Sequence, residues 1–254
     1  MICQRGWIVL GLCLVGHAAG QTTKPNLNGI WEAFSTANWD LQDHAAQAGP
    51  FWQTGAIGAE PAGIGVVVGG EIPYLPAALA KKKENFANRA KLDPEAKCYL
   101  PGVPRATYMP YPFQIVQSPK DVLIVYEFAS ANRLINMGKP KEAGADSWMG
   151  TSNGHWEGNT LVVDTVGFND KFWFDYKGHP HTEKLHTIER YTRTDLGHMS
   201  MEVTIDDPGA YVKPFTTVGK ATLMPGTELL EYICQENNQD LPLLQGPARG
   251  PGGQ

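Results

Sequence analysis

The sequence has little charge and no excess of positive charge. Of its 254 residues only 19% are charged, and the net charge is −5. A nucleic-acid-binding domain would need a basic face, which this balance disfavours. The 28 glycines and 19 prolines exclude long helical bundles and coiled coils, because both residue types interrupt helices. The 9 phenylalanines, 9 tyrosines and 7 tryptophans exclude a mostly disordered chain. These counts leave a soluble domain rich in strands and loops.

A hydrophobic run long enough to span a membrane is missing near the N-terminus. The apolar stretch Trp7–Gly16 is too short for that purpose. It follows Arg5 and precedes Ala18-Ala19-Gly20, and this order describes a secretory signal peptide. We expect residues 1–20 to be cleaved off near Gly20 and Gln21, and the protein to be periplasmic or secreted. A membrane anchor is the alternative interpretation.

The remaining chain is expected to form one domain over residues 21–240, followed by a disordered tail at 241–254. Proline is dense between residues 93 and 119, which therefore form an extended, Pro-rich strap rather than a helix or a central strand. Only Cys98 and Cys234 remain after export. An even pair in an oxidising compartment favours a disulfide between them. Two separate buried thiols are the alternative.

Paired runs of β-branched and aromatic residues, joined by short turns, predict antiparallel hairpins. The expected strands are 27–32, 113–117, 122–128, 155–156, 161–165, 185–194, 199–206, 213–223 and 228–235. One helix is expected at 77–90, and one short strand at 64–68. The predicted fold is all-β and mainly antiparallel, a lipocalin- or calycin-like β-barrel or a strongly curved meander sheet with one short N-terminal helix. Alternation places Met199, Met201, Val203 and Ile205 on one face of their strand.

The segment 168–190 combines histidines, acids and aromatics, and it connects two hairpins. Three interpretations of it stay open. His179 and His181, with Glu183 or His186 as a third ligand, would bind zinc or iron. Alternatively, His181 or His186 is an acid–base group that Asp175 or Glu183 orients. In the third, the histidines cap strand ends and the aromatics plug the barrel mouth.

The substrate walls are expected to come from the same segment and from two neighbouring ones. The candidate substrate-binding residues are Phe168, Trp173, Tyr176, Arg190, Tyr191 and Arg105. Alternation along 185–193 leaves two possibilities for the cavity. If His186 and Arg190 point inward, the cavity is cationic; if Glu189 and Tyr191 do, it holds an acid and a phenol. Asn132 and Arg133 are expected at a pocket rim.

Several stretches together resemble an uncharacterised family of secreted bacterial proteins. The matching stretches are Cys98–Arg105, Pro110–Gln117, His155–Thr165, Gly178–His186, Glu189–Tyr191, Asp206–Pro208 and Glu228–Cys234. The family pattern usually has Asp at the position of Asn159, a difference confined to a turn. This resemblance implies no activity. Separately, Gly29-Ile30-Trp31 is similar to the Gly-x-Trp motif of lipocalin-type barrels, where the Trp closes the barrel floor.

These expectations combine into one hypothesis with two alternatives. The hypothesis is a secreted enzyme that performs lyase, isomerase or hydratase chemistry on a small apolar or aromatic molecule. It needs no cofactor, no nucleic acid and no membrane span in its mature form. The first alternative is a non-catalytic, lipocalin-like ligand-binding protein. The second is an enzyme that depends on zinc or iron held by His179, His181 and His186.

Overall fold

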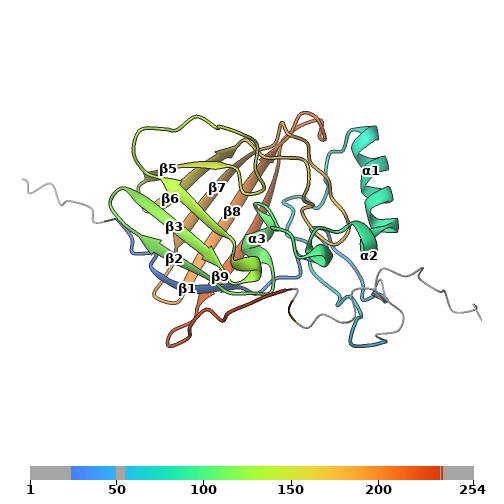
Figure 1. Ribbon diagram of the computed structural model, residues 1–254, viewed down its shortest axis with the longest axis horizontal. Helices are drawn as coiled ribbons and strands as arrows, with labels where there is room; N and C mark the ends of the chain where they lie inside the picture. The colour runs from blue at the N-terminus through green and yellow to red at the C-terminus, as the bar shows by residue number, and fades with distance from the viewer. Residues whose placement is uncertain (1–23, 50–54, 235, 237–254) are drawn as a thin grey trace, which may run out of the picture.

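A computed structural model describes residues 24–49, 55–234 and 236. The expected signal peptide at 1–20 and the expected tail at 241–254 lie outside the described residues. Nine strands form a closed barrel in chain order, as the sequence predicted (Figure 1). They are β1 (Gly29–Ala33), β2 (Phe113–Gln117), β3 (Asp121–Tyr126), β4 (Asn132–Asn136), β5 (Thr151–Glu157), β6 (Thr160–Val166), β7 (His186–Arg193), β8 (His198–Asp206) and β9 (Phe215–Leu223).

Every neighbouring pair of strands is antiparallel except β4 and β5, which are parallel. The connection 137–150 carries the chain back along the barrel, so that β5 runs in the same direction as β4 (Figure 1). A tight hairpin turn cannot join parallel strands, and this accounts for the length of the connection. The sequence did not predict β4 as a strand. The expected strand at 228–235 is also wrong, because residues 228–234 contain no strand.

The helices are short and gather at one end of the barrel. They are α1 (Pro76–Ala87), α2 (Arg89–Leu92) and α3 (Arg105–Tyr108), with 3-10 turns η2 (Glu95–Lys97) and η3 (Phe128–Ser130). The expected helix at 77–90 corresponds to α1 and the start of α2, separated at Asn88. Figure 1 shows α3 against the barrel and α1 and α2 farther out at the same end. We call this the capped end. Among the described residues, no helix has the length and apolar character that a membrane span needs.

The barrel interior is packed by the inward faces of the strands. Met199, Met201, Val203 and Ile205 are buried, as their alternation predicted. Trp31 is fully buried, and its indole Nε1 donates a hydrogen bond to the Leu27 carbonyl at 2.9 Å. Arg193 lies over the Trp31 ring at 5.4 Å. The Gly-x-Trp tryptophan is therefore a core residue at the end of the barrel opposite the capped end.

A short edge of β9 remains after β1 ends. β1 pairs with β9 only from Trp31 to Ala33. Beyond that point the backbone of 66–68 takes the edge: Val68 N donates to Thr216 O, and Val218 N donates to Val66 O, both at 2.8 Å. The expected strand at 64–68 is thus reduced to a single bridge between Val67 and Thr217. This seam is where the barrel wall is incomplete, and it positions the site described below.

The disulfide between Cys98 and Cys234 forms as predicted, across a sequence separation of 136 residues. It ties the C-terminal segment to the Pro-rich strap. Along that strap, Arg105 is fully buried in an ion-pair network rather than in a ligand pocket. Its Nη1 and Nη2 donate to the Asp93 carboxylate at 2.8 and 3.1 Å, and it also pairs with Glu95. Arg105 therefore ties α3 to Asp93 and Glu95. The prediction that 93–119 is extended throughout is wrong, because this segment contains η2, α3 and β2.

Candidate functional site in the barrel interior

The structure decides which face of β7 points into the barrel. Thr187, Glu189 and Tyr191 are buried inside, whereas His186 and Arg190 lie on the outer face. His186 Nε2 faces Asp164 Oδ1 at 2.9 Å, and Arg190 pairs with Glu157 near the surface. His186 is therefore separated by the barrel wall from the interior, and Arg190 is not part of the cavity. The interior therefore holds the carboxylate of Glu189 and the phenol of Tyr191.

Arg133 of β4 crosses the barrel interior and pairs with Glu189. Its Nε donates to Ser152 Oγ at 2.8 Å, and its Nη2 donates to Thr165 Oγ1 at 2.6 Å and to the Glu189 carboxylate. The Tyr191 hydroxyl donates to the other Glu189 oxygen at 2.6 Å. Burial works against the charged guanidinium, but the carboxylate of Glu189 raises the pKa of Arg133 above its ordinary value. Arg133 therefore stays charged, and its pairing with Glu189 lies in the core.

Two hydrogen-bonding groups of this network have no partner among the described residues: Arg133 Nη1 and Thr187 Oγ1. Arg133 is 3% exposed and Thr187 is fully buried. A buried polar group without a partner costs about 1–3 kcal/mol. The two residues are close in the fold, because Thr165, which contacts Arg133, is the direct cross-strand partner of Thr187. We call Arg133, Glu189, Thr187, Ser152 and Thr165 the barrel polar cluster.

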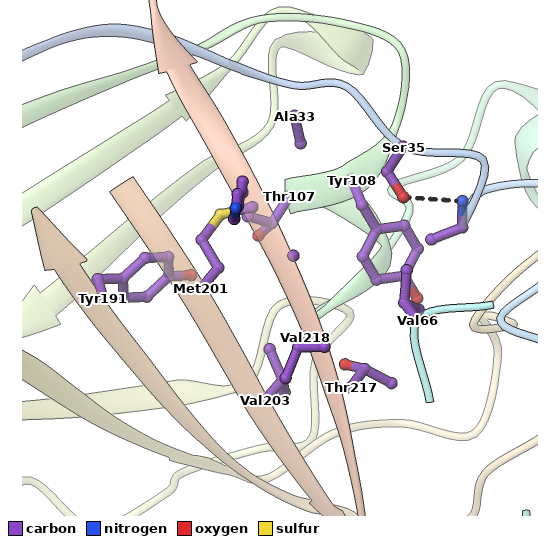
Figure 2. A pocket seen from close by; sticks show the side chains of 13 residues that line it. Ala33, Ser35, Val66, Thr107, Tyr108, Tyr191, Met201, Val203, Thr217 and Val218 are labelled. Carbon is purple, nitrogen blue, oxygen red and sulfur yellow. Dashed lines mark hydrogen bonds between the residues drawn. The ribbon is translucent and has the colours of Figure 1, made fainter. Parts of the chain in front are cut away.

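A small cavity lies against the opposite, apolar side of the interior. Its volume is about 30 Å³, enough for a very small group. Figure 2 shows its lining, in which Tyr191 and Met201 approach from the barrel wall and Thr107 and Tyr108 from α3. Thr107 Oγ1 lies 3.4 Å from the Tyr126 hydroxyl, and Tyr191 bonds Glu189. One layer of hydrogen-bonded side chains therefore separates the cavity from Arg133.

A surface groove of about 630 Å³ lies next to the cavity. The two share five lining residues at the seam between 66–68 and β9, namely Ser35, Val66, Val218, Gly219 and Lys220. The groove carries exposed apolar side chains: Phe34 is 70% exposed, Ile64 87% and Val218 46%. Exposed apolar side chains gathered around a hollow are typical of a binding site. The groove and the cavity thus adjoin each other at this seam.

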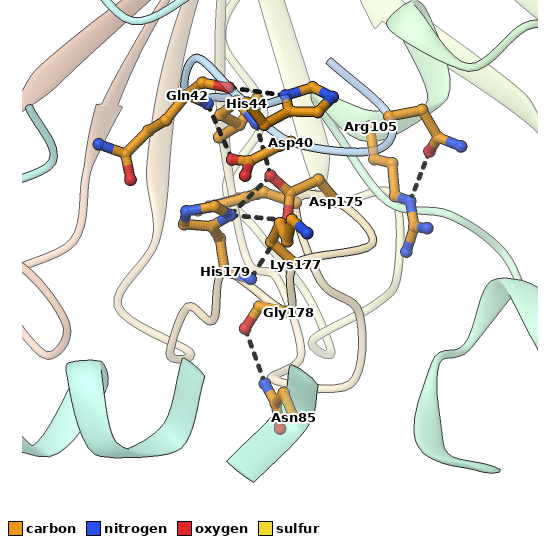
Figure 3. Close-up of polar contacts among 12 residues, drawn as sticks. Asp40, Gln42, His44, Asn85, Arg105, Asp175, Lys177, Gly178 and His179 are labelled. Carbon is orange, nitrogen blue, oxygen red and sulfur yellow. Dashed lines mark hydrogen bonds and ion pairs between the residues drawn. The ribbon is translucent and has the colours of Figure 1, made fainter. Parts of the chain in front are cut away.

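A second polar cluster lies in the capped end, where the predicted orienting acid is found. His179 Nδ1 lies 2.6 Å from the Asp175 carboxylate, and both residues are fully buried (Figure 3). Asp175 also accepts from Leu41 N at 2.7 Å, and Asp40 lies beside it. Burial first, and Asp175 second, raise the pKa of Asp40. Asp175 therefore orients His179, not His181 or His186 as the sequence suggested.

His179 leaves one ring nitrogen free. Its Nε2 has no partner among the described residues, and neither has the Tyr74 hydroxyl. The two rings are stacked with centroids 6.0 Å apart. A wall separates this cluster from the cavity: Tyr108 lines the cavity, and its hydroxyl donates to Phe174 O at 2.6 Å, next to Asp175. The oriented imidazole therefore lies just behind the cavity wall.

The three histidines do not assemble into the expected metal site within the described part of the chain. The group whose donor atoms gather within 4.8 Å is instead Asp40, Asp175 and His179. His181 packs between aromatic rings, with centroids 3.9 Å from Phe172 and 5.3 Å from Phe174. His186 is on the outer barrel face. A ligand set of His179, His181 and His186 is therefore ruled out by placement.

The other predicted site residues do not gather at one point. Phe168 and Trp173 are buried, and Phe168 packs edge-on against Phe172 at 5.8 Å. Tyr176 lies under the Arg105 guanidinium at 5.9 Å. Glu183 is exposed, so it does not orient a buried histidine. Of the expected substrate walls, only Tyr191 lines the cavity.

His181 gives a pH-dependent contribution to stability. Burial lowers its pKa to about 4, whereas an unfolded histidine titrates at about 6.5. As the pH falls below about 6.5, His181 is protonated in the unfolded state before it is protonated in the folded state. The stabilisation that comes from its neutral form is therefore complete above about pH 6.5 and is lost as the pH falls toward 4. We expect His181→Gln to flatten the pH dependence of the free energy of unfolding in this window by roughly 2–4 kcal/mol. Urea unfolding of both proteins at pH 7 and pH 4 measures it; parallel profiles would show that His181 is not the titrating group.

The most informative interior residues were missed at the level of the sequence. Arg133 was placed at a pocket rim, and β4 was not recognised, because Asn132-Arg133-Leu134-Ile135-Asn136 does not alternate between polar and apolar residues. Gly150-Thr151-Ser152-Asn153-Gly154 also fits the G-x-S-x-G pattern of a nucleophile elbow. The structure decides against that role, because Ser152 lies within β5 rather than between a strand and a helix, and it contacts Arg133 and Thr165 rather than a histidine.

No family model, no curated protein and no solved structure matches this chain. The argument for function therefore depends on the two polar clusters, the cavity and the groove.

Proposed function

We propose that this protein binds a small, mainly apolar molecule, whose chain lies in the groove and whose end enters the cavity. The observation that carries the proposal is the adjacency of the two hollows: an apolar-rimmed groove shares five lining residues with a cavity that Tyr191 also lines. This is the ligand-binding alternative of the sequence hypothesis. The cavity of about 30 Å³ admits only the end of a ligand, so most of the ligand is held in the groove.

Gly219 offers a direct test, because it lines both hollows. A Cβ at this position would meet Met201 Cε at 3.5 Å, an ordinary contact, so a side chain is tolerated there. We expect Gly219→Leu to fill the passage and to reduce binding of the neutral fluorescent probe N-phenylnaphthylamine by about tenfold or more, a loss of roughly 1.4 kcal/mol. Fluorescence titration measures the affinity.

Gly144→Leu is the matched control. Gly144 is exposed, and its Cβ would meet no atom within 4 Å. We expect this variant to bind the probe as the wild type does. Equal affinities of wild type and Gly219→Leu, or the absence of probe binding by the wild type, would reject the proposal.

Acid–base catalysis is a second candidate, favoured by the Asp175–His179 pair. An imidazole that is held at Nδ1 by a carboxylate and free at Nε2 has the arrangement of an oriented general base. The test is to incubate a bound ligand with wild type and with His179→Gln and to analyse the recovered ligand by mass spectrometry. Conversion by wild type alone supports catalysis. Recovery of unchanged ligand from both rejects it and leaves binding in place.

A further inference from the structure

The inner surface of the barrel is divided into a polar half and an apolar half. Cross-strand pairing aligns Ser152 with Thr165 and Thr165 with Thr187, so three hydroxyls form a row across β5, β6 and β7. The same row continues across β8 and β9 as Ile205 and Phe215. One row deeper, Glu189 is followed by Val203. In these rows the buried hydrogen-bonding groups lie mainly on β5, β6 and β7, and Thr217 of β9, which lines the cavity, is the exception.

The polar half has donor capacity to spare. Glu189 accepts from Arg133 and from Tyr191, and Ser152 and Thr165 bond to Arg133 and to each other. After these bonds, Arg133 Nη1 and Thr187 Oγ1 remain without a partner among the described residues. A guanidinium N–H donates and never accepts, and a hydroxyl can donate. The two atoms together therefore suit an oxygen acceptor.

The charge of the cluster selects among acceptors. Arg133 is already neutralised by Glu189, and both side chains are buried (1% and 0% exposed). A ligand carboxylate would bring a second negative charge into the core beside Glu189, which is costly. A neutral carbonyl oxygen accepts the same hydrogen bonds without that penalty. A primary amine is cationic, so the guanidinium of Arg133 would repel it.

The size of the cavity and its position also favour a neutral carbonyl group at the end of the ligand. The cavity of about 30 Å³ fits a group no larger than the end of a chain. Its polar wall residues, Thr107 and Tyr191, each contact a residue next to Arg133, namely Tyr126 and Glu189. Tyr191 stands between the cavity and Glu189, so the ligand end has to displace this ring and its hydrogen bond to Glu189 to approach Arg133.

We infer that the barrel polar cluster recognises the neutral carbonyl oxygen of an apolar molecule, such as a ketone or an ester, through Arg133 Nη1 and Thr187 Oγ1. This inference rests on the proposed function and names the ligand class of the same site.

The experiment compares four ten-carbon compounds as competitors of N-phenylnaphthylamine: a methyl ketone, the alkane, the carboxylate and the primary amine. We expect the ketone to bind about tenfold or more tightly than each of the others, as a hydrogen bond to a charged donor predicts. Thr187→Val removes one donor at nearly constant shape. It is expected to reduce the preference for ketone over alkane about threefold to tenfold and to leave the affinity for the alkane unchanged.

Two further variants keep the result interpretable. Thr192→Val, on the outer face of β7, is the matched control and should keep the preference. Arg133→Met combined with Glu189→Leu removes the guanidinium without leaving a lone charge, and it should abolish the preference. Equal affinity for ketone and alkane, or a preference that survives both the Thr187 and the double variant, would overturn the inference while probe binding still upholds the proposed function. If no probe binds, the proposed function fails as well.

Discussion

Replacing Glu189 by Gln is expected to lower the free energy of unfolding by about 3–5 kcal/mol, because it leaves the Arg133 charge uncompensated in the core. Glu189 is fully buried and holds both Arg133 and the Tyr191 hydroxyl. Because Glu189 is not exposed, water cannot easily take the place of its carboxylate as the partner of Arg133. Urea unfolding at neutral pH, with the transition followed by tryptophan fluorescence, measures the change.

The adjacent residue on the same strand provides the control. Arg190 points outward and pairs with Glu157 at the surface. Exposed ion pairs contribute about 0–1 kcal/mol, so Arg190→Gln is expected to change stability by less than about 1 kcal/mol. The double variant Arg133→Met/Glu189→Leu should recover most of the loss caused by Glu189→Gln. Similar effects of Glu189→Gln and Arg190→Gln would show that the ion pair does not lie in the barrel core.

Removing the disulfide is expected to have the second large effect. Replacing Cys98 and Cys234 with Ser frees a loop with a sequence separation of 136 residues. In the chain-entropy model such a closure contributes on the order of 4–5 kcal/mol. The described part of the C-terminal segment is also held by Leu230 N, which donates to Glu127 at 2.8 Å, and by Tyr232, which packs on Tyr111 and Phe128.

The measurement compares three samples: oxidised wild type, reduced wild type and the double Ser variant. Reduced wild type and the variant should unfold at the same urea concentration, below that of the oxidised protein. A variant as stable as the oxidised wild type would mean that the crosslink does not constrain the unfolded chain.

Sequence reasoning predicted the barrel because its signal is local. Alternation such as Met199-x-Met201-x-Val203-x-Ile205 assigns one face of a strand to the core regardless of neighbours. The disulfide followed from the even number of cysteines outside the expected signal peptide. The strand at 228–235 was wrong: Leu230 and Ile233 are exposed, and Tyr232 packs on Phe128 and Tyr111 rather than in a ladder.

The sites were harder to predict, since their residues come from distant parts of the chain. Asp40 and Asp175 lie 135 positions apart, and Arg133 and Glu189 lie 56 apart. The inward face of β7 could not be chosen from its own pattern, because each face carries an ionisable group. The choice depends on β4, where Arg133 supplies the cation that Glu189 needs. The segment 168–190 did contain a histidine–acid pair. The spacing of its residues did not show which of the three histidines Asp175 contacts, and the structure shows that it is His179.

The most direct test of the central claim is a crystal structure of the protein with a brominated apolar ketone. The account predicts anomalous bromine density in the groove near Phe34 and Val218, and the ketone oxygen within hydrogen-bonding distance of Arg133 Nη1. Bromine density outside the groove and the cavity, with the Arg133 environment unchanged, would contradict it.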